Sequence, residues 1–347
     1  MIGSRTSNGL ERWKKVLRRG RALYVSGDRV WASRGARLLL SSDGGRSFDD
    51  LGLAPMRRRA WAFTALGERL ARAGFHALTE ISPTEAVAIV TGGIVRWNQG
   101  AFSDFFPIPV GPRPLGLVRD FNDRIYFGEY WRNPTREPVR IFVSEDHGRT
   151  WQVAYTFPRG TIRHVHTVLT DDFDRDALYI LTGDEDAECA IYRTRDSFRT
   201  LEKLAHGSQL TRAIAAHAAP EGVYFATDTE RARNRVRLLG RDGRLTEIGD
   251  ISGSGWGCCS VGTRLFFTTA IEPSEVNRDR YARLYECSSG AGLSEVGSAR
   301  KDFLPKKAFQ YGTFVLPKGP GDGKNLWATP WSVSGHGSLL KLGLDEI

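Results

Sequence analysis

Short apolar runs rich in β-branched and aromatic residues recur along this chain of 347 residues. They occur in pairs separated by a polar break, as at residues 124–127 and 141–143, or 177–180 and 191–193. Runs of this length and composition are typical of β-strands, and the helical period is nearly absent. Because the runs are short and evenly spaced, the pattern predicts an all-β fold.

A turn motif accompanies this strand pattern. Residues 144–151 read Ser-Glu-Asp-His-Gly-Arg-Thr-Trp, the same spacing recurs at residues 41–48, and a degraded copy occupies residues 194–200. In such a turn the Asp side chain accepts backbone hydrogen bonds and the Gly adopts the positive φ of the bend. The turns recur every roughly 46 to 55 residues, near the blade period of propellers. The turn residues of the successive repeats are Asp43, Asn98, Asp146, Asp196, Asp242 and Ser289.

This motif resembles the Asp box, or BNR repeat, which joins the two outer strands of each blade in sialidase-like β-propellers. The stretches GEYWRNP, RHVHTV and LTGDEDAECAIY extend the resemblance to a poorly characterised branch of such propellers. Some members of that branch accompany polysaccharide and glycan metabolism, which implies a carbohydrate-associated function. The chain lacks the Phe/Tyr-Arg-Ile-Pro segment of true sialidases before its first Asp box, so sialidase activity is not expected.

The two ends of the chain predict how the ring closes. Residues 339–342 form a third-strand run that no fourth strand follows, whereas residues 11–16 resemble a fourth strand that no blade precedes. Pairing the two would remove both open sheet edges. We therefore predict a seven-bladed β-propeller of four-stranded antiparallel blades, with the N-terminal strand (about residues 10–17) completing the last blade of a single domain over residues 1–347. Six or eight blades remain alternatives, because the strands between residues 57 and 106 are hard to delimit.

Charge and composition narrow the class of partner. The formal charge is +9 and the sequence pI is about 9.5. The arginines are spread over most repeats, which argues against nucleic acid and favours an anionic glycan. The N-terminus lacks the apolar core of a secretion signal and no apolar run reaches the ~18 residues of a membrane span, so a cytoplasmic protein without a membrane partner is expected. The four cysteines have no zinc-ligand spacing.

Strand direction predicts which residues line the central channel mouth. Inner strands begin at this mouth and second strands end there, so both sets of side chains should converge, subject to the register of each strand. The residues at the inner-strand starts are Arg59, Arg113, Arg163, His164, Arg212, Trp256 and Tyr311, and Gln310 is a further candidate beside Tyr311. The residues at the second-strand ends are Glu129, Tyr130, Asp184, Asp228 and Glu272.

These residue types suit an acidic sugar. Arginine binds a carboxylate through two parallel hydrogen bonds, and aromatic rings stack on sugars. We therefore expect Arg59, Arg113, Arg163, Arg212, Asp184, Asp228, Trp256, Glu272 and Gln310 to bind substrate. The alternative is that the arginines pair with the carboxylates as a structural network between blades.

His164 and His166 are the sharpest candidates for chemistry, because alternate residues of a strand share a face. The two imidazoles are expected to share a ligand, a metal or a proton-transfer role, and a divalent cation would need a third ligand such as Glu129 or Asp184. No cofactor is predicted with certainty.

Several propeller-shaped polysaccharide lyases resemble this set in combining Arg with His and Tyr. The resemblance implies β-elimination at a uronic acid, with Arg163 or Arg212 as the neutraliser, His164 or His166 as the base and Tyr130 or Tyr311 as the acid. Hydrolysis would instead draw two acids from Glu129, Asp184, Asp228 and Glu272. The sequence thus favours an acidic-glycan lyase or hydrolase, and the alternative is a non-catalytic propeller that binds glycan or protein.

Overall fold

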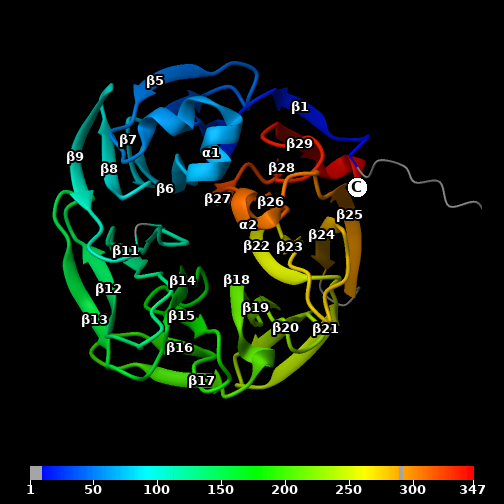
Figure 1. The fold of residues 1–347 in the computed structure, drawn as a ribbon. Coiled ribbons are helices and arrows are strands. Elements are labelled where there is room, and N and C mark those ends of the chain that lie inside the picture. Colours follow the sequence, from blue (N-terminus) through cyan, green and yellow to red (C-terminus); the bar gives the residue numbers. More distant parts are fainter. Residues whose placement is uncertain (1–9, 112, 289–291) are drawn as a thin grey trace, which may run out of the picture.

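The computed structural model describes residues 10–111, 113–288 and 292–347, and it is a ring of seven blades (Figure 1). Each blade is built of four antiparallel strands, as predicted, and the first blade has a short fifth strand as well. The first nine residues, from which the absence of a secretion signal was inferred, and the turn residue Ser289 lie outside the described residues. No helix in the described part of the chain is long and apolar enough to cross a membrane.

The first three blades run in chain order, each from its innermost to its outermost strand. They are β2 (Arg21–Ser26), β3 (Arg29–Arg34), β4 (Arg37–Ser41) and β5 (Asp49–Leu53); β6 (Phe75–Ser82), β7 (Glu85–Val90), β8 (Gly93–Asn98) and β9 (Ala101–Pro107); and β10 (Val118–Arg119), β11 (Ile125–Gly128), β12 (Val139–Ser144) and β13 (Gln152–Phe157).

The next three blades follow the same order. They are β14 (His164–Thr170), β15 (Leu178–Gly183), β16 (Ala190–Thr194) and β17 (Glu202–His206); β18 (Ala213–Ala219), β19 (Gly222–Thr227), β20 (Arg235–Gly240) and β21 (Leu245–Asp250); and β22 (Ser254–Val261), β23 (Arg264–Ala270), β24 (Tyr281–Ser288) and β25 (Gly292–Arg300).

The last blade combines both ends of the described chain. Its strands are β26 (Thr313–Val315), β28 (Asn325–Trp331), β29 (Leu339–Gly343) and, outermost, β1 (Lys14–Leu17). Strand β1 pairs antiparallel with β29, with Lys14 opposite Lys341, so the predicted closure is confirmed. A short extra strand, β27 (Lys318–Gly321), pairs parallel with β2 and gives the first blade a fifth strand. The first and last blades are therefore joined in two ways: the chain passes from β1 to β2, and β27 pairs with β2.

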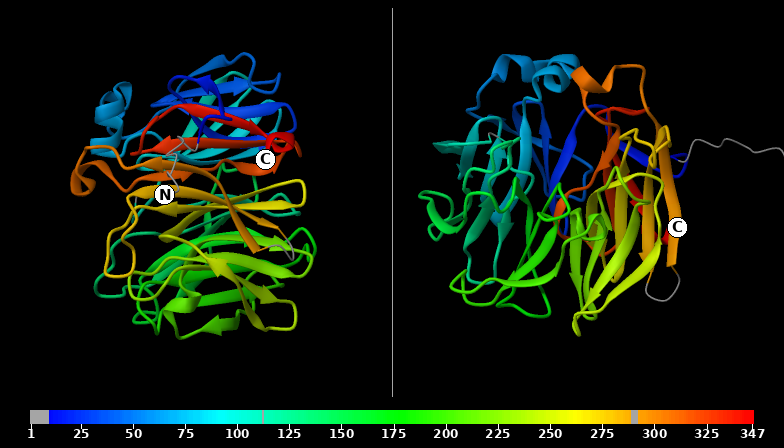
Figure 2. Two further views of the ribbon diagram at one scale, coloured as in Figure 1. Left: turned by 90° about the vertical axis from the view of Figure 1, so that its right-hand side faces the viewer. Right: turned by 60° about the horizontal axis from the view of Figure 1, so that its bottom comes forward.

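Helical segments interrupt the ring in two places. The 3-10 helix η1 (Arg59–Phe63) and the helix α1 (Ala65–Ala71) lie between the first two blades, and α2 (Lys306–Phe309) lies between the last two. They project from one face of the ring (Figure 2). Two further 3-10 turns are η2 (Gln209–Thr211) and η3 (Leu344–Glu346). The first insertion explains why the second repeat was difficult to delimit from the sequence.

The turns at the outer edges of three blades share one hydrogen-bonding pattern. In the turn between β12 and β13, Ser144 donates through Oγ to Asp146 (2.8 Å), and Thr150 donates to Asp146 through its backbone N–H (2.9 Å) and its hydroxyl (2.6 Å). The turns at Asp43 and Asp196 have equivalent bonds. The degraded copy at residues 194–200 keeps this pattern because the hydroxyl of Thr194 takes the place of the Ser hydroxyl.

The core lies in layers between neighbouring blades. At the first interface, Trp31 is fully buried, and its Nε1–H donates to Glu80 of the next blade at 2.6 Å. Its ring packs edge-on against Trp97 with centroids 5.5 Å apart. Glu80 also accepts from the guanidinium of Arg29 (2.6 Å). Such contacts hold the blades at fixed angles, and this rigid ring positions the residues at its centre.

Candidate active site

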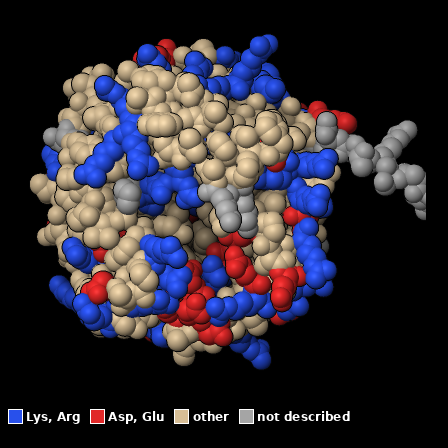
Figure 3. Space-filling model, in the orientation of Figure 1, with Lys and Arg blue, Asp and Glu red and all other residues tan. Residues whose placement is uncertain are grey.

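A cavity of about 920 Å³ lies on the face that carries α1 and α2, since Arg72 beside α1 and Gln310 beside α2 both line it. It is lined by residues from the inner-strand starts and the second-strand ends of successive blades. In Figure 3 the hollow in this face has Lys and Arg groups along its upper side and Asp and Glu groups below. The cavity is thus a mixed-charge site with a basic side and an acidic side.

Most of the residues selected from strand direction line this one cavity. They are Arg113, Tyr130, Arg163, His164, His166, Asp184, Arg212, Asp228, Trp256, Glu272, Gln310 and Tyr311. The carboxylates follow the pattern closely, since Asp184 comes directly after β15 and Asp228 directly after β19. Their placement agrees with the predicted convergence, and the roles assigned to them stay predictions.

Two predicted residues do not line the cavity. Arg59 begins the exposed helix η1, so its placement at an inner-strand start is wrong: the inner strand of that blade begins only at Phe75. Glu129 is fully buried beside the cavity residue Tyr130, and its Oε2 accepts from the backbone N–H of Arg140 at 2.8 Å. Burial raises the pKa of Glu129. Both residues follow the end of β11, and the side chain of Tyr130 lines the cavity whereas that of Glu129 is buried away from it.

The cavity also contains residues that the sequence analysis missed. They include Arg21, Arg72, His76, Arg132 and Trp331. Arg21 starts the inner strand β2 and Trp331 ends the second strand β28, so the same strand-direction rule would have found both had it been applied to the first and last blades. Arg72 directly follows helix α1, and the strand-direction rule does not apply to it.

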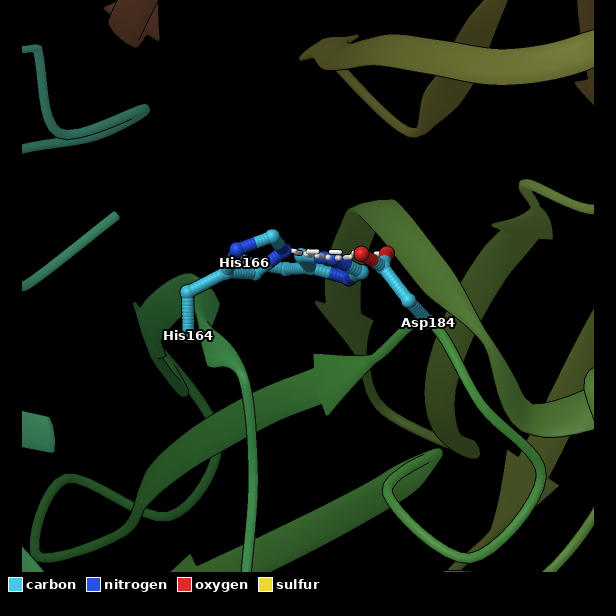
Figure 4. Close-up of side chains that lie close together, drawn as sticks. All are labelled: His164, His166 and Asp184. Atoms are coloured by element: carbon cyan, nitrogen blue, oxygen red, sulfur yellow. Dashed lines mark hydrogen bonds and ion pairs between the residues drawn. The ribbon is translucent and has the colours of Figure 1, made fainter. Parts of the chain in front are cut away.

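Two histidines and an aspartate lie close together in the cavity (Figure 4). The Nε2 atoms of His164 and His166 are 3.0 Å apart. Asp184 Oδ1 lies 3.6 Å from Nε2 of His164 and 3.4 Å from Nε2 of His166. The histidines are 4% and 2% exposed, so their orientation is fixed by the protein rather than by solvent.

Each of the two imidazoles is held in place by a backbone carbonyl near its Nδ1 atom. Nδ1 of His164 is 2.7 Å from the carbonyl oxygen of Trp131, and Nδ1 of His166 is 2.9 Å from that of Ala213. Gly183, beside Asp184, leaves room for this arrangement: an added Cβ would lie 3.1 Å from both His166 Cε1 and Arg212 Cγ. A larger residue at position 183 would therefore push against the group.

Arginines connect this group to the other carboxylates. Arg163 donates to Asp184 Oδ2 at 2.9 Å, and Nη2 of Arg212 lies 3.3 Å from Asp184 and 3.6 Å from Asp228. Burial alone would raise the pKa of Asp184, but its interactions with His164 and His166 lower that pKa well below the usual range. Burial, with a smaller contribution from the charge of Glu272, raises the pKa of Asp228 to about 7 despite the opposing charge of Arg212. The two carboxyl groups thus have opposite pKa shifts.

Two tyrosines border the same space. The ring of Tyr130 is centred 4.2 Å from that of His164, and burial together with the charge of Asp184 raises the pKa of the Tyr130 hydroxyl. Burial and the neighbouring Glu272 raise the pKa of Tyr311 to about 12. Both phenols are therefore protonated at neutral pH and can donate a proton or a hydrogen bond.

The basic side of the cavity has a different character. Arg72 and Arg113 form no ion pair with an acidic residue in the described part of the chain. Burial and the neighbouring charges of Arg72 and Arg58 lower the pKa of Arg113. Like charges held together without acidic partners favour the binding of an anion.

Comparisons with known proteins support the fold. No family model and no curated protein sequence matches the chain, so the resemblance to Asp-box propellers stays a prediction. Among solved structures, the GH74 xyloglucanase from Xanthomonas campestris superposes with a TM-score of 0.61 at 16% identity, over 97% of this chain and 54% of that one. An ancestral GH74 enzyme gives 0.56 at 12% identity, over 95% and 47%.

A propeller outside the glycoside hydrolases is equally similar. YCF48, in a complex with a D1 peptide, gives a TM-score of 0.59 at 10% identity, over 99% of this chain and all of that one. The chain spans less than half the length of the first structures it matches, and about half that of the xyloglucanase. At these identities the comparisons establish the propeller fold alone.

Proposed function

We propose that this propeller binds an acidic oligosaccharide or polysaccharide in the central cavity and cleaves it there. The observation that supports this function best is the convergence of Arg113, Arg163 and Arg212 with two imidazoles and Tyr130 around one space. A cavity of about 920 Å³ can enclose several sugar units, since ligand pockets typically measure ~300–1,000 Å³. The similarity in fold to GH74 enzymes is consistent with a carbohydrate ligand.

The basic side provides the anchor for an acidic sugar. Arg163 and Arg212 already contact carboxylates of the protein, whereas no such partner is found for Arg72 and Arg113 among the described residues. A uronate carboxylate bound by Arg113 would relieve the repulsion between these guanidinium groups and accept two parallel hydrogen bonds. This favours an acidic glycan over a neutral one.

The acidic side provides groups for β-elimination. A guanidinium neutralises the uronate carboxylate, an imidazole of the His164–His166 pair takes the proton from the carbon next to that carboxylate, and the C–O bond to the leaving sugar breaks as a C=C bond forms. The Tyr130 hydroxyl gives its proton to the leaving oxygen. Tyr130 is suited to this role because its ring lies against that of His164.

A direct assay tests this function. The protein is incubated with a panel of acidic glycans, and the near-ultraviolet absorbance of unsaturated uronates is followed. We expect the double change His164→Ala and His166→Ala to reduce the rate at least about 100-fold, while His206→Ala, a change of an exposed outer-strand histidine, leaves it unchanged. A wild-type protein that cleaves no acidic glycan would contradict the proposal.

Hydrolysis is the second candidate, and the position of two carboxyl groups favours it. Asp184 and Asp228 both lie within 3.6 Å of Arg212 Nη2, so they face the same part of the cavity. Paired carboxyl groups are what glycoside hydrolysis requires. The same panel distinguishes the reactions, since a hydrolase would release reducing ends without ultraviolet absorbance. Saturable binding without either product would instead favour a non-catalytic propeller, and the similar structure of YCF48 bound to a D1 peptide is an example of a ligand-binding propeller.

A further inference from the structure

We propose that His164, His166 and Asp184 form a binding site for one divalent transition-metal ion. Each of the three residues offers one ligand atom, and these atoms lie within 4.8 Å of one another. Figure 4 shows the two rings and the carboxylate directed toward a common point. Two imidazoles and one carboxylate on one side of an ion is a ligand set that zinc, iron(II), manganese and cobalt accept.

The first argument is the hydrogen bonding of the outer ring nitrogens. The carbonyl oxygens of Trp131 and Ala213 can only accept, so the Nδ1 atoms that face them at 2.7 and 2.9 Å carry the protons. In a neutral imidazole the other nitrogen is then a bare lone pair. The two Nε2 atoms consequently direct lone pairs at each other across 3.0 Å, which is unfavourable unless a positive centre lies between them. Metal-binding histidines are commonly held by Nδ1 in this way.

The second argument is the distance to the third ligand. A proton shared by the two Nε2 atoms would leave Asp184 Oδ1 at 3.4 and 3.6 Å, longer than a good hydrogen bond to either. Ligand atoms about 2.0–2.2 Å from a common ion lie roughly 3.0–3.5 Å from one another. The three observed separations of 3.0, 3.4 and 3.6 Å therefore need only small adjustments to accept an ion.

The residues around this site would leave a bound ion accessible from the cavity and would balance its charge. All three residues line the cavity, so further coordination positions face its interior and are open to water or a substrate oxygen. Arg163 and Arg212 bring positive charge to Asp184, while Asp228 and Glu272 place further carboxyl groups on this side of the cavity. Buried imidazole ligands select a transition metal over calcium or magnesium, which prefer oxygen ligands.

This inference goes beyond the proposed function and does not depend on it. A bound ion would give the histidines the task of holding it, and a substrate carboxylate could then coordinate it. In that case the histidines would no longer act as the base, and the neighbouring Tyr130 would keep its role as proton donor. Protein that binds the metal but cleaves no glycan would support the metal site and count against the proposed function. Protein that cleaves glycan after complete metal removal and binds no added ion would support the function and count against the metal site.

Metal titration tests the site directly. The full chain is stripped with a chelator, and binding of Zn²⁺ and Co²⁺ is followed by calorimetry, by elemental analysis after dialysis, and by the visible spectrum of the Co²⁺ form. We expect one ion per chain, with Co²⁺ bands typical of nitrogen and oxygen ligands. Asp184→Asn, which keeps the shape of the side chain, should weaken binding at least tenfold, and His166→Gln should abolish the bands.

The controls address folding and adventitious binding. His206→Gln removes an exposed histidine and should change neither stoichiometry nor affinity. The melting temperature of each stripped variant shows whether it is folded, and the wild-type Co²⁺ spectrum reports on the site without any variant. Absence of stoichiometric binding by the wild type, or the same affinity in Asp184→Asn as in the wild type, would overturn the inference.

Discussion

The aspartates of the outer turns and Asp228 of the central cavity have opposite pKa shifts. At the outer edge, hydrogen bonds from Ser47 lower the pKa of Asp43, and those from Thr150 and Ser144 lower the pKa of Asp146 although burial alone would raise it. At the cavity, burial raises the pKa of Asp228 to about 7. The outer carboxylates stabilise the fold as anions, whereas Asp228 is held where ionisation is costly.

This difference indicates that the outer turns and the central cavity have separate roles. The outer turns satisfy their carboxylates within a few residues of chain, so their contribution is to stability. The cavity groups converge from blades far apart in the chain and are only partly compensated, which is typical of a functional site. Substitutions in the two regions should therefore affect different measurements.

The largest effect is expected at Tyr130. Tyr130→Phe removes only the hydroxyl, so cleavage of an acidic glycan should fall by about 100-fold, the size of a lost general acid. The unfolding midpoint in urea should stay close to that of the wild type. Tyr155→Phe, in the outer strand β13, is the matched change and should leave the rate unaffected. Equal rates for Tyr130→Phe and the wild type would remove Tyr130 from the mechanism.

Asp228 should show its raised pKa in the pH dependence of stability. Its folded pKa of about 7 exceeds the usual value, so the unfolded chain loses this proton at lower pH than the folded one. Stability from this group is therefore present at acid pH, declines between about pH 4 and pH 7, and is absent above.

Asp228→Asn abolishes that decline, because an amide does not ionise. Relative to the wild type it should gain stability as the pH rises from 4 to 7, by on the order of 3 kcal/mol. Urea titrations at several pH values measure the difference between the two proteins. A constant difference across this range would show that Asp228 does not titrate there.

A substitution of Arg113 should lower the affinity for ligand without lowering the stability of the fold. It has no acidic partner among the described residues, so Arg113→Ala should leave the melting temperature unchanged or slightly raised by relief of repulsion. Affinity for an acidic oligosaccharide should fall about tenfold, the value of one charge-assisted contact. Calorimetry measures the affinity, and Arg244→Ala, in an exposed outer turn, serves as the control. An unchanged affinity would place the anion elsewhere.

The smallest effect is expected at the outer turn. Asp146→Asn weakens the bonds from Thr150 and should cost about 1 kcal/mol at neutral pH, without changing activity per folded molecule. Because the pKa of Asp146 is lowered in the folded state, this stability is present above about pH 4 and is lost as the pH falls further. Urea unfolding at pH 7 and pH 3 checks both statements, with Glu145→Asn on the same turn as the control. A larger loss at pH 3 than at pH 7 would contradict them.

The sequence by itself determined the strand pattern, the three hydrogen-bonded turns and the closure by β1, because each depends on local spacing or on matching two open edges. It also indicated which residues reach the cavity wherever a strand end was clear, as at Asp184 and Asp228. The strand pattern and the turns depend on residues that are close in the chain, whereas the closure by β1 follows from the count of strands at the two ends.

Only the tertiary structure decided the details of the site. It showed that the insertion carrying η1 displaces Arg59, that Glu129 turns into the blade beside the cavity residue Tyr130, and that Arg72 enters the cavity. It alone brought Asp184 to the two histidines and fixed their rings against the carbonyls of Trp131 and Ala213. These contacts join residues about 20 to 50 positions apart, and their geometry depends on how rigid blades pack rather than on any local preference.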